Sequence, residues 1–293
     1  MRFQGIIVPM LTPFLRDGGL DEETLRTFSD RLIEGGVHGL FPSSSIGEAA
    51  AMSPEERERS IEVVLDQAGG RVPVLPGTGS SDLPTTLRLT RFAEEVGAQG
   101  AVVVTTYYLK PDQRGMVDYF NRVAREVDIP VVLYHIPMAT GVEMSAETVA
   151  SIAENDNVVG LKDSSADMIR LSRIRALTGE DFAVFQGLDP LLLPSLEVGC
   201  QGGMVATPNL VPGIAVDLYN AFQKGDHQEA RRLHERVVPL FHACMSHGVF
   251  PAGFKAASRM LGLDLGGPRP AIRPLDREER YSLEGRLSDQ GFL

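Results

Sequence analysis

Cysteine is scarce in this chain: Cys200 and Cys244 are the only two among 293 residues, and they do not form a C-x-x-C motif. The sequence therefore indicates neither a disulfide scaffold nor a zinc ribbon, and it favours a reducing compartment. Long apolar runs are also missing, since the N-terminal run of about seven residues is broken by a proline and is too short for a signal peptide or a membrane span. We expect a cytoplasmic protein without a membrane partner.

Clusters of basic residues are absent as well. The net charge is -11, and a nucleic-acid surface needs concentrated lysine or arginine, so no nucleic-acid partner is expected. The six histidines are scattered and no H-E-x-x-H occurs, so we predict no metal site. A hydrophobic content of 43% is ample for a folded core.

Short apolar runs alternate with amphipathic segments along most of the chain. The segments carry helix signals, such as Ser53 as a cap followed by Pro54. Such alternation predicts a parallel sheet, and eight units within about 225 residues favour a closed (β/α)8 TIM barrel over an open doubly wound sheet. No G-x-G-x-x-G follows the first run, which weakens the alternative of a dinucleotide-binding fold. The eight runs cover residues 5–11, 39–44, 73–79, 100–106, 130–136, 158–164, 182–188 and 202–207.

The pattern changes near residue 225. Beyond it lie helical segments without an intervening strand run, and the Pro- and Gly-rich stretch 265–274 connects to the last helix. We predict a catalytic barrel over residues 1–225 and a C-terminal helical extension over 226–293.

Lysine is rare too, at four against 24 arginines, yet Lys162 ends the apolar stretch "NVVGLKDSS". Alternate side chains of a barrel strand point inward, so Lys162 is expected to share the interior face with Val158 and Gly160, at the end where barrel enzymes hold their active sites. Gly160 would leave it room. By the same parity, Tyr134 on the preceding run can reach the amine.

An amine among apolar groups is poorly solvated when charged, which favours the neutral nucleophile, and a nearby phenol can relay protons. Lys162 and Tyr134 thus suggest Schiff-base chemistry. From spacing alone, a lysine whose ammonium reaches solvent, beside a packed aromatic, is an equally good interpretation. His135 and Asp163 are expected to point away from the interior, with Asp163 pinning a loop. Lys255 is expected to face solvent or an interface.

The sequence Tyr134-His135-Ile136-Pro137, followed by Thr140-Gly141 and later by "GLKDSS", resembles the paired signature of the dihydrodipicolinate synthase and N-acetylneuraminate lyase family. The resemblance extends, in order, through "GIIVPMLTPF", "SSIGEAAAMSPEER", "TTYYLKP" and "PRPAIRPLD". It implies that Lys162 forms a Schiff base with pyruvate or a 2-keto acid and that Tyr134 moves protons. It also implies a homotetramer that needs no metal and no organic cofactor.

The family's Gly-Ser/Thr-Thr-Gly-Glu motif corresponds here to residues 44–48, "SSIGE". Ser45 keeps a hydroxyl for the proton relay, whereas Ile46 has lost one. The resemblance places Ser44 and the N–H groups of Ser45 and Ile46 in a pocket for the pyruvate carboxylate, since amide-lined turns bind anions. A serine-rich loop leading to a helix cap is the simpler alternative.

Two further positions gain roles only from the resemblance. Tyr108 matches a tyrosine that reaches into a neighbouring subunit's site, and packing at an interface is its alternative; Tyr107 has no assigned role. Gly187 is expected to offer its carbonyl to the site.

Ala139 departs from the family pattern, because the synthases carry an arginine there that binds the carboxylate of aspartate semialdehyde. Its loss should weaken binding by several kcal/mol unless another cation replaces it. Ala139-Thr140-Gly141 instead resembles the 2-keto-3-deoxygluconate-type aldolases. We therefore expect a class I carbon–carbon lyase that cleaves a 2-keto-3-deoxy sugar acid to pyruvate and a small aldehyde. Alternatives are 4-hydroxy-tetrahydrodipicolinate synthase, a related dehydratase, a metal-dependent barrel lyase and a non-catalytic keto-acid sensor.

Overall fold

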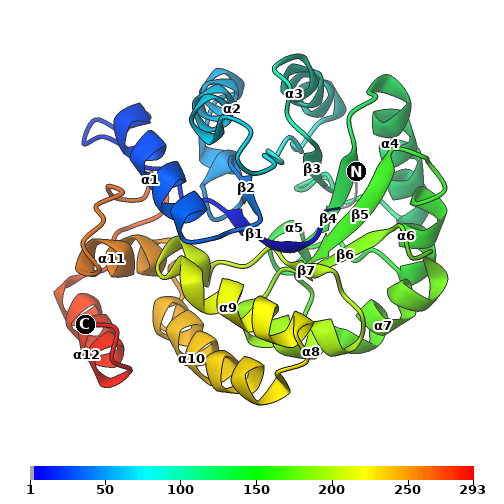
Figure 1. The fold of residues 1–293 in the computed structure, drawn as a ribbon. Coiled ribbons are helices and arrows are strands. Elements are labelled where there is room, and N and C mark those ends of the chain that lie inside the picture. Colours follow the sequence, from blue (N-terminus) through cyan, green and yellow to red (C-terminus); the bar gives the residue numbers. More distant parts are fainter. Residues whose placement is uncertain (1–2) are drawn as a thin grey trace.

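The computed structural model describes residues 3–293, and within them seven parallel strands form one sheet in the order β2-β1-β7-β6-β5-β4-β3. Helices surround this ring of strands, as Figure 1 shows, so the predicted parallel barrel is confirmed. The strands are β1 Gly5–Pro9, β2 Gly39–Phe41, β3 Ala101–Val104, β4 Val131–His135, β5 Val158–Asp163, β6 Ala183–Gln186 and β7 Gly202–Gly203.

The run 73–79 fills the gap between β2 and β3 without being a regular strand. The N–H of Leu75 donates to Leu40 O on β2 at 2.8 Å, and the N–H of Thr78 donates to a β3 carbonyl at 3.0 Å. Pro73 and Pro76 carry no N–H and cannot extend the ladder. The prediction of a regular strand over 73–79 was wrong, although the segment lies between β2 and β3, where that strand was expected.

The barrel interior is filled by apolar side chains, as expected for this architecture. One buried cluster draws on β1, β2, the run 73–79, β3, β4, β6 and the residue after β7, with Val159 of β5 packed against it. Its members are Phe3, Ile7, Phe41, Leu75, Val102, Val132, Tyr134, Ala183, Phe185 and Met204.

The alternation along β5 is shifted by a bulge. Val131 of β4 pairs with Val158, but the next β4 residue pairs with Gly160, so Val159 is an extra residue. Val159 packs toward the interior and Val158 packs in the outer layer, the reverse of the prediction. Beyond the bulge the predicted parity holds, and Lys162 lies inside.

The helices of the barrel begin at strong sequence signals. The helix at Pro54 starts with the predicted Ser53 cap, and Ser53 and Glu56 form a reciprocal capping box. The barrel helices are α1 Glu22–Glu34, α2 Pro54–Ala68, α3 Leu83–Glu95, α4 Gln113–Glu126, α5 Pro137–Thr140, α6 Ala146–Ile152, α7 Met168–Leu177, α8 Leu192–Glu197 and α9 Pro212–Gln223.

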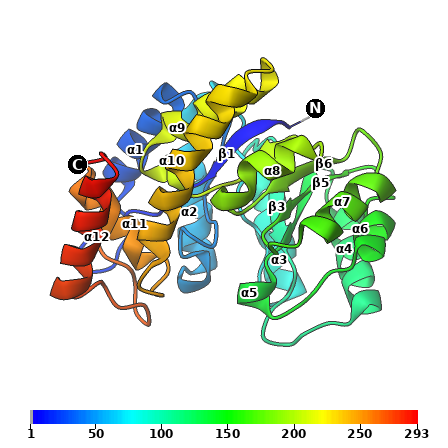
Figure 2. The ribbon, with the colours of Figure 1, turned by 90° about the horizontal axis from the view of Figure 1, so that it is seen from below.

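Three more helices follow: α10 His227–Met245, α11 Ala252–Met260 and α12 Arg277–Asp289. Figure 2 shows them together on the side of α1 and α9, away from α4, α6 and α7. They share one apolar core with α1, α9 and β1. Because the core continues across residue 225, it does not mark a boundary there, and the predicted division into barrel and extension stays a prediction. In the part of the chain that the structure covers, no helix has the length and apolar character that a membrane span requires.

Candidate active site

Lys162 lies near the carboxyl end of β5 and is only 3% exposed. It is in register with Tyr134 on β4 and with Phe185 on β6. Its Nζ lies 4.1 Å from the ring centre of Tyr134 and 5.1 Å from that of Phe41. The amine is therefore enclosed by aromatic faces, and the interpretation of a lysine reaching solvent is wrong.

A cavity of about 260 Å³ lies at this end of the barrel, bounded by the loops after β2, β3 and β4. Tyr134 lines it together with four other predicted site residues. These are Ser44, Ser45, Ala139 and Thr140. Residues far apart in the sequence are thus brought to one place, and that place is the end of the barrel at which such folds hold their active sites.

The loop that contains Ser44 is held by its own backbone contacts. Ser44 Oγ donates to Met10 O at 3.2 Å and accepts from the N–H of Gly47 at 3.2 Å. Within residues 3–293 the N–H groups of Ser45 and Ile46 have no hydrogen-bond acceptor. The Ile46 side chain packs in the core and does not line the cavity. Two adjacent free amides suit an anion, and their role as a carboxylate pocket stays a prediction.

Two other predicted residues make contacts that limit their roles. Thr140 Oγ1 donates to Ile136 O at 3.1 Å and accepts from the N–H of Val142 at 3.2 Å, so the turn already engages its hydroxyl. Gly187 leaves no space for a side chain, because a Cβ would lie 2.0 Å from Ser164 Oγ and 3.1 Å from Lys162 Cε. Gly187 therefore secures room for the lysine, and its carbonyl role stays a prediction.

Comparison with known proteins explains this arrangement. A model of the dihydrodipicolinate synthetase family matches residues 2–290. The chain belongs to the dihydrodipicolinate synthetase family. Enzymes of this family are pyruvate-dependent lyases that form a covalent Schiff base on a lysine and use no external cofactor. The predicted family and lyase class are confirmed.

Three relatives illustrate the likeness. A 4-hydroxy-tetrahydrodipicolinate synthase from a strain of Thermus thermophilus is 48% identical over 99% of this chain and 97% of its own. Among solved structures, dihydrodipicolinate synthase DapA-2 of Bacillus anthracis gives a TM-score of 0.95 at 32% identity, covering 98% of both chains. YagE of E. coli K12, a family member solved in complex with pyruvate, gives 0.94 at 31% identity over 99% of both.

The two adjacent tyrosines, Tyr107 and Tyr108, have different surroundings in this structure. Tyr107 lines the cavity, although the sequence assigned it no role. Tyr108 is 90% exposed and does not line the cavity of its own chain. Its reach into a neighbouring subunit stays a prediction.

His135 and Asp163 point away from the barrel interior, as predicted. His135 Nε2 accepts the N–H of Met144 at 3.1 Å, so its Nδ1 is the atom that donates to Asp163 Oδ1 at 3.2 Å. Arg170 Nη2 donates to the same carboxylate at 2.6 Å, and the N–H of Ser165 does so at 2.9 Å. Burial raises the pKa of Asp163, but the His135 hydrogen bond and the Arg170 charge outweigh it, so the pKa lies below its usual range.

Lys255 corrects another prediction, because it is 2% exposed and faces neither solvent nor an interface. Its Nζ lies 2.8 Å from Glu48 Oε1 and donates to Gly267 O at 2.9 Å. Burial lowers the pKa of Lys255, and the Glu48 charge offsets part of that effect. The alanines around Lys255 are thus packing partners that bring the amine beside the loop of residues 44–48.

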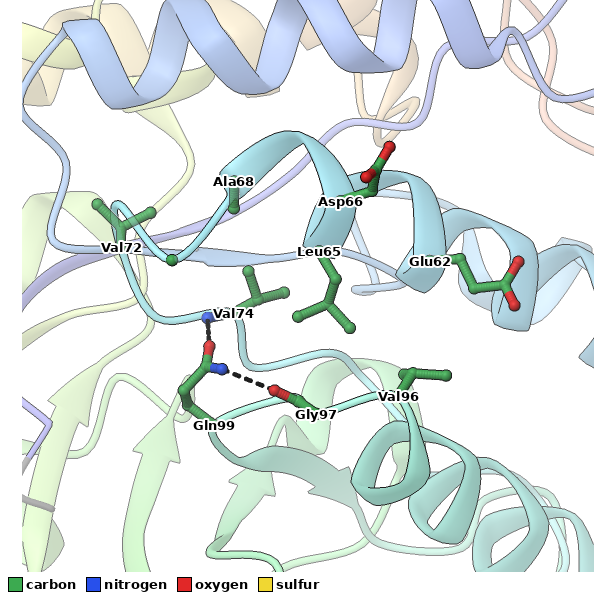
Figure 3. A pocket seen from close by; sticks show the side chains of 10 residues that line it. Glu62, Leu65, Asp66, Ala68, Val72, Val74, Val96, Gly97 and Gln99 are labelled. Atoms are coloured by element: carbon green, nitrogen blue, oxygen red, sulfur yellow. Dashed lines mark hydrogen bonds between the residues drawn. The ribbon is translucent and has the colours of Figure 1, made fainter.

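Figure 3 shows a second cavity, of about 380 Å³. It lies between α2 and the segment before β3, where the Gln99 side chain accepts the N–H of Val74 and donates to Gly97 O. It is at the amino ends of the strands and contains none of the predicted site residues. We do not assign it to catalysis.

Sequence reasoning missed several residues that line the catalytic cavity, among them Phe41, Arg57, Tyr107 and Phe250. Arg57 could have been found, because it precedes Ile61 by one helical turn and Val64 by two and so falls on the apolar face of α2. Phe250 comes from the C-terminal extension, and no local pattern connects it with the barrel.

Proposed function

We propose that this chain is a class I lyase that binds pyruvate as a Schiff base on Lys162. The observation that supports it best is the buried amine between Tyr134 and Phe41, beside the cavity. The neutral amine adds to the keto carbon, and loss of water with uptake of one proton yields a cationic imine. Loss of a C3 proton gives an enamine, which attacks an aldehyde, and water then releases the product and the amine. Tyr134 is placed to exchange these protons.

For the aldehyde we infer aspartate semialdehyde, which makes the reaction that of 4-hydroxy-tetrahydrodipicolinate synthase. The 48% identical Thermus relative bears this name. Ala139 stands where the synthases carry a carboxylate-binding arginine, but the cavity holds another cation, Arg57. This assignment replaces the sugar-acid aldolase as the leading proposal.

Cleavage of a 2-keto-3-deoxy sugar acid is the second candidate. Besides Ala139, it is favoured by Ser164, whose Oγ is buried beside Gly187 and lacks a hydrogen-bond partner within the described residues. A free hydroxyl at this place could bind a hydroxyl of the substrate.

A substrate panel tests both candidates. Pyruvate is supplied with aspartate semialdehyde or with glyceraldehyde, 2-keto-3-deoxygluconate is supplied alone, and pyruvate consumption or release is followed. We expect aspartate semialdehyde to give the highest kcat/KM, by roughly tenfold or more. The reverse order establishes the second candidate. Activity that vanishes with chelator and survives Lys162→Ala overturns both in favour of a metal-dependent lyase, and pyruvate binding without any turnover indicates a sensor.

We further propose a cytoplasmic homotetramer in which Tyr108 completes the site of a neighbouring subunit. Its support is the 90% exposure of Tyr108 and its positive φ of 73°, a strained conformation that persists mainly at functional positions. Tyr108→Phe and Lys162→Ala chains, each nearly inactive, are co-expressed. Activity that reappears in the mixed oligomer supports the shared site, and a mixture without recovery contradicts it.

A further inference from the structure

The register of β5 against β4 decides which way Lys162 points. Beyond the bulge in β5, Tyr134 is paired with Lys162 and His135 is paired with Asp163. In a regular pairing without the bulge, every β5 residue beyond this point would move by one position and its side chain would change face. Leu161 would then enter the barrel, and Lys162 would enter the outer layer.

The apolar residues of β5 do not select between these two registers. Val158 and Leu161 pack in the outer layer, and Val159 packs against the interior cluster. Both faces of the strand are apolar, as is usual in a parallel sheet, so each of these side chains suits either face. A bulge leaves one residue without a partner in the ladder, so backbone hydrogen bonding favours the regular pairing. Another interaction must therefore hold β5 in the bulged register.

Asp163 is the β5 residue that suits only one face. Its Oδ1 accepts hydrogen bonds from His135 Nδ1 at 3.2 Å, from Arg170 Nη2 at 2.6 Å and from the Ser165 N–H at 2.9 Å. The side chains of His135 and Asp163 are 0% and 3% exposed, and that of Arg170 is 11% exposed. In the regular register the carboxylate would turn into the barrel and lose these donors, which is costly for a buried charge.

Arg170 extends these contacts beyond the two strands. It lies on α7, and its Nη1 donates to Met144 O at 2.7 Å. The N–H of Met144 in turn donates to His135 Nε2 at 3.1 Å. The ends of β4 and β5, the segment after α5 and the start of α7 are thus fixed around one carboxylate. Specifying a register is the best-attested use of buried polar groups of this kind.

We propose that Asp163, His135 and Arg170, the register cluster, hold β5 in the bulged pairing that turns Lys162 inward, opposite Tyr134. The three residues do not line the cavity, so they are positioning residues that act through Lys162. The activity readout of this inference rests on the proposed Schiff base on Lys162, whereas its structural readout does not.

A triple variant, His135→Leu/Asp163→Leu/Arg170→Met, tests the proposal. Replacing a buried polar network by apolar side chains of similar size often leaves stability unchanged, so we expect a urea midpoint near that of the wild type. The rate of borohydride trapping at saturating pyruvate should nevertheless fall roughly 100-fold, since a displacement of about 1 Å can cost that much. The half-saturating pyruvate concentration should change less than about threefold, because residues 44–46 take no part in the cluster. Trapping at the wild-type rate overturns the proposal.

Two single variants keep the test decisive if the triple variant does not fold. Asp163→Asn retains an oxygen that can accept the same hydrogen bonds, so trapping should slow by less than about threefold. Arg170→Met removes the arginine contacts and should slow trapping roughly tenfold. Its matched control, Arg173→Met, removes an exposed ion pair with Glu147 from the same helix and should change the rate less than about twofold. Equal effects of the two arginine variants count against the proposal.

Crystal structures of the wild type and the triple variant provide a readout that needs no pyruvate. The variant should show the regular register in at least part of the molecules, with Leu161 opposite Tyr134 and without the bulge. A variant that keeps the bulge in every molecule overturns the proposal. If the wild-type protein traps no pyruvate, the proposed function fails, and the comparison of registers still decides on the register cluster.

Discussion

Lys255 and Glu48 form an ion pair of 2.8 Å that joins the helical extension to the mouth of the barrel, with side chains 2% and 1% exposed. Glu48 directly follows the loop of residues 44–47 and adopts a left-handed backbone conformation. Its other carboxylate oxygen accepts the N–H of Arg269 at 2.7 Å. The extension therefore holds the loop that contains the free amides of Ser45 and Ile46.

Lys255→Met should lower the free energy of unfolding by about 3–5 kcal/mol, because it leaves the Glu48 carboxylate buried and unpaired. Adding Glu48→Gln should recover part of this loss, as removing both charges costs less than removing one. Urea denaturation measures both values. The matched control is Lys224→Met on the surface, which should change stability by less than about 0.5 kcal/mol. A double variant as unstable as the single one would contradict the pairing.

Borohydride reduction in the presence of pyruvate should add a stable mass to the peptide that contains Lys162. The reason is that the buried amine contacts Tyr134 and Phe41, which line the cavity, whereas Lys110 and Lys224 are exposed and do not line it. Mass spectrometry of the digest identifies the modified residue. Lys162→Ala should show no adduct and Lys224→Ala an undiminished one; an unlabelled wild-type protein refutes the mechanism.

Gly187→Ala should slow pyruvate trapping on Lys162 by roughly tenfold or more, because the new Cβ would lie 2.0 Å from Ser164 Oγ and 3.1 Å from Lys162 Cε. Single-turnover trapping rates give the comparison. Adding Ser164→Ala removes the nearest atom and should restore part of the rate. The control is Gly179→Ala, where a Cβ would meet no neighbour. Unchanged trapping in Gly187→Ala would show that the lysine does not need this space.

The two thiols should not react with Ellman's reagent in the native protein. Cys200 and Cys244 are free and buried, and burial raises the pKa of Cys200 to about 12 and the pKa of Cys244 as well. Since the thiolate is the reactive form, both should titrate only after unfolding. The absorbance of the released thiolate at the end of the reaction gives the number of thiols that have reacted. Rapid reaction of either thiol in the folded enzyme would contradict the burial described.

Acid should weaken the fold partly through Asp163. Its pKa in the folded state lies below the ordinary value of 3.8, so the folded state favours the ionised form. The resulting stabilisation is fully present above pH 3.8 and is lost as the pH falls through the lower, folded value. The difference in unfolding free energy between wild type and Asp163→Asn should therefore be constant near neutrality and shrink in acid. If the difference between wild type and Asp163→Asn persists at the lowest pH, the stabilisation does not come from the ionised Asp163 carboxylate.

Much of the fold could be predicted because its signals are local. The alternation of apolar runs and capped helices indicated the barrel, and parity placed Tyr134 and Lys162 together. The bulge at Val159 was not predictable in this way, since apolar residues fit both faces of a buried strand. Pro73 and Pro76 are a local signal against a regular strand in the run 73–79, because neither offers an N–H to the ladder.

Contacts between distant segments explain most of the remaining errors. Lys255 meets Glu48, and Phe250 meets the cavity, only because the extension folds back on the barrel mouth. Arg57 is a different case: it was missed although its place on the apolar face of α2 can be read from the sequence. The role proposed for Tyr108 requires a second subunit, which a single chain cannot show.

The two prolines in the run 73–79 have a consequence for motion. Pro73 and Pro76 offer no N–H, so this run has fewer main-chain donors than a strand of the same length without proline. We expect this part of the barrel wall, a seam, to open locally at a lower free energy than β4 and β5. Gly77 and Gly79 hold Arg57 from this same run. Amide exchange should be faster along the seam than in the regular strands, and a ligand that fills the cavity lined by Gly77 and Gly79 should slow it.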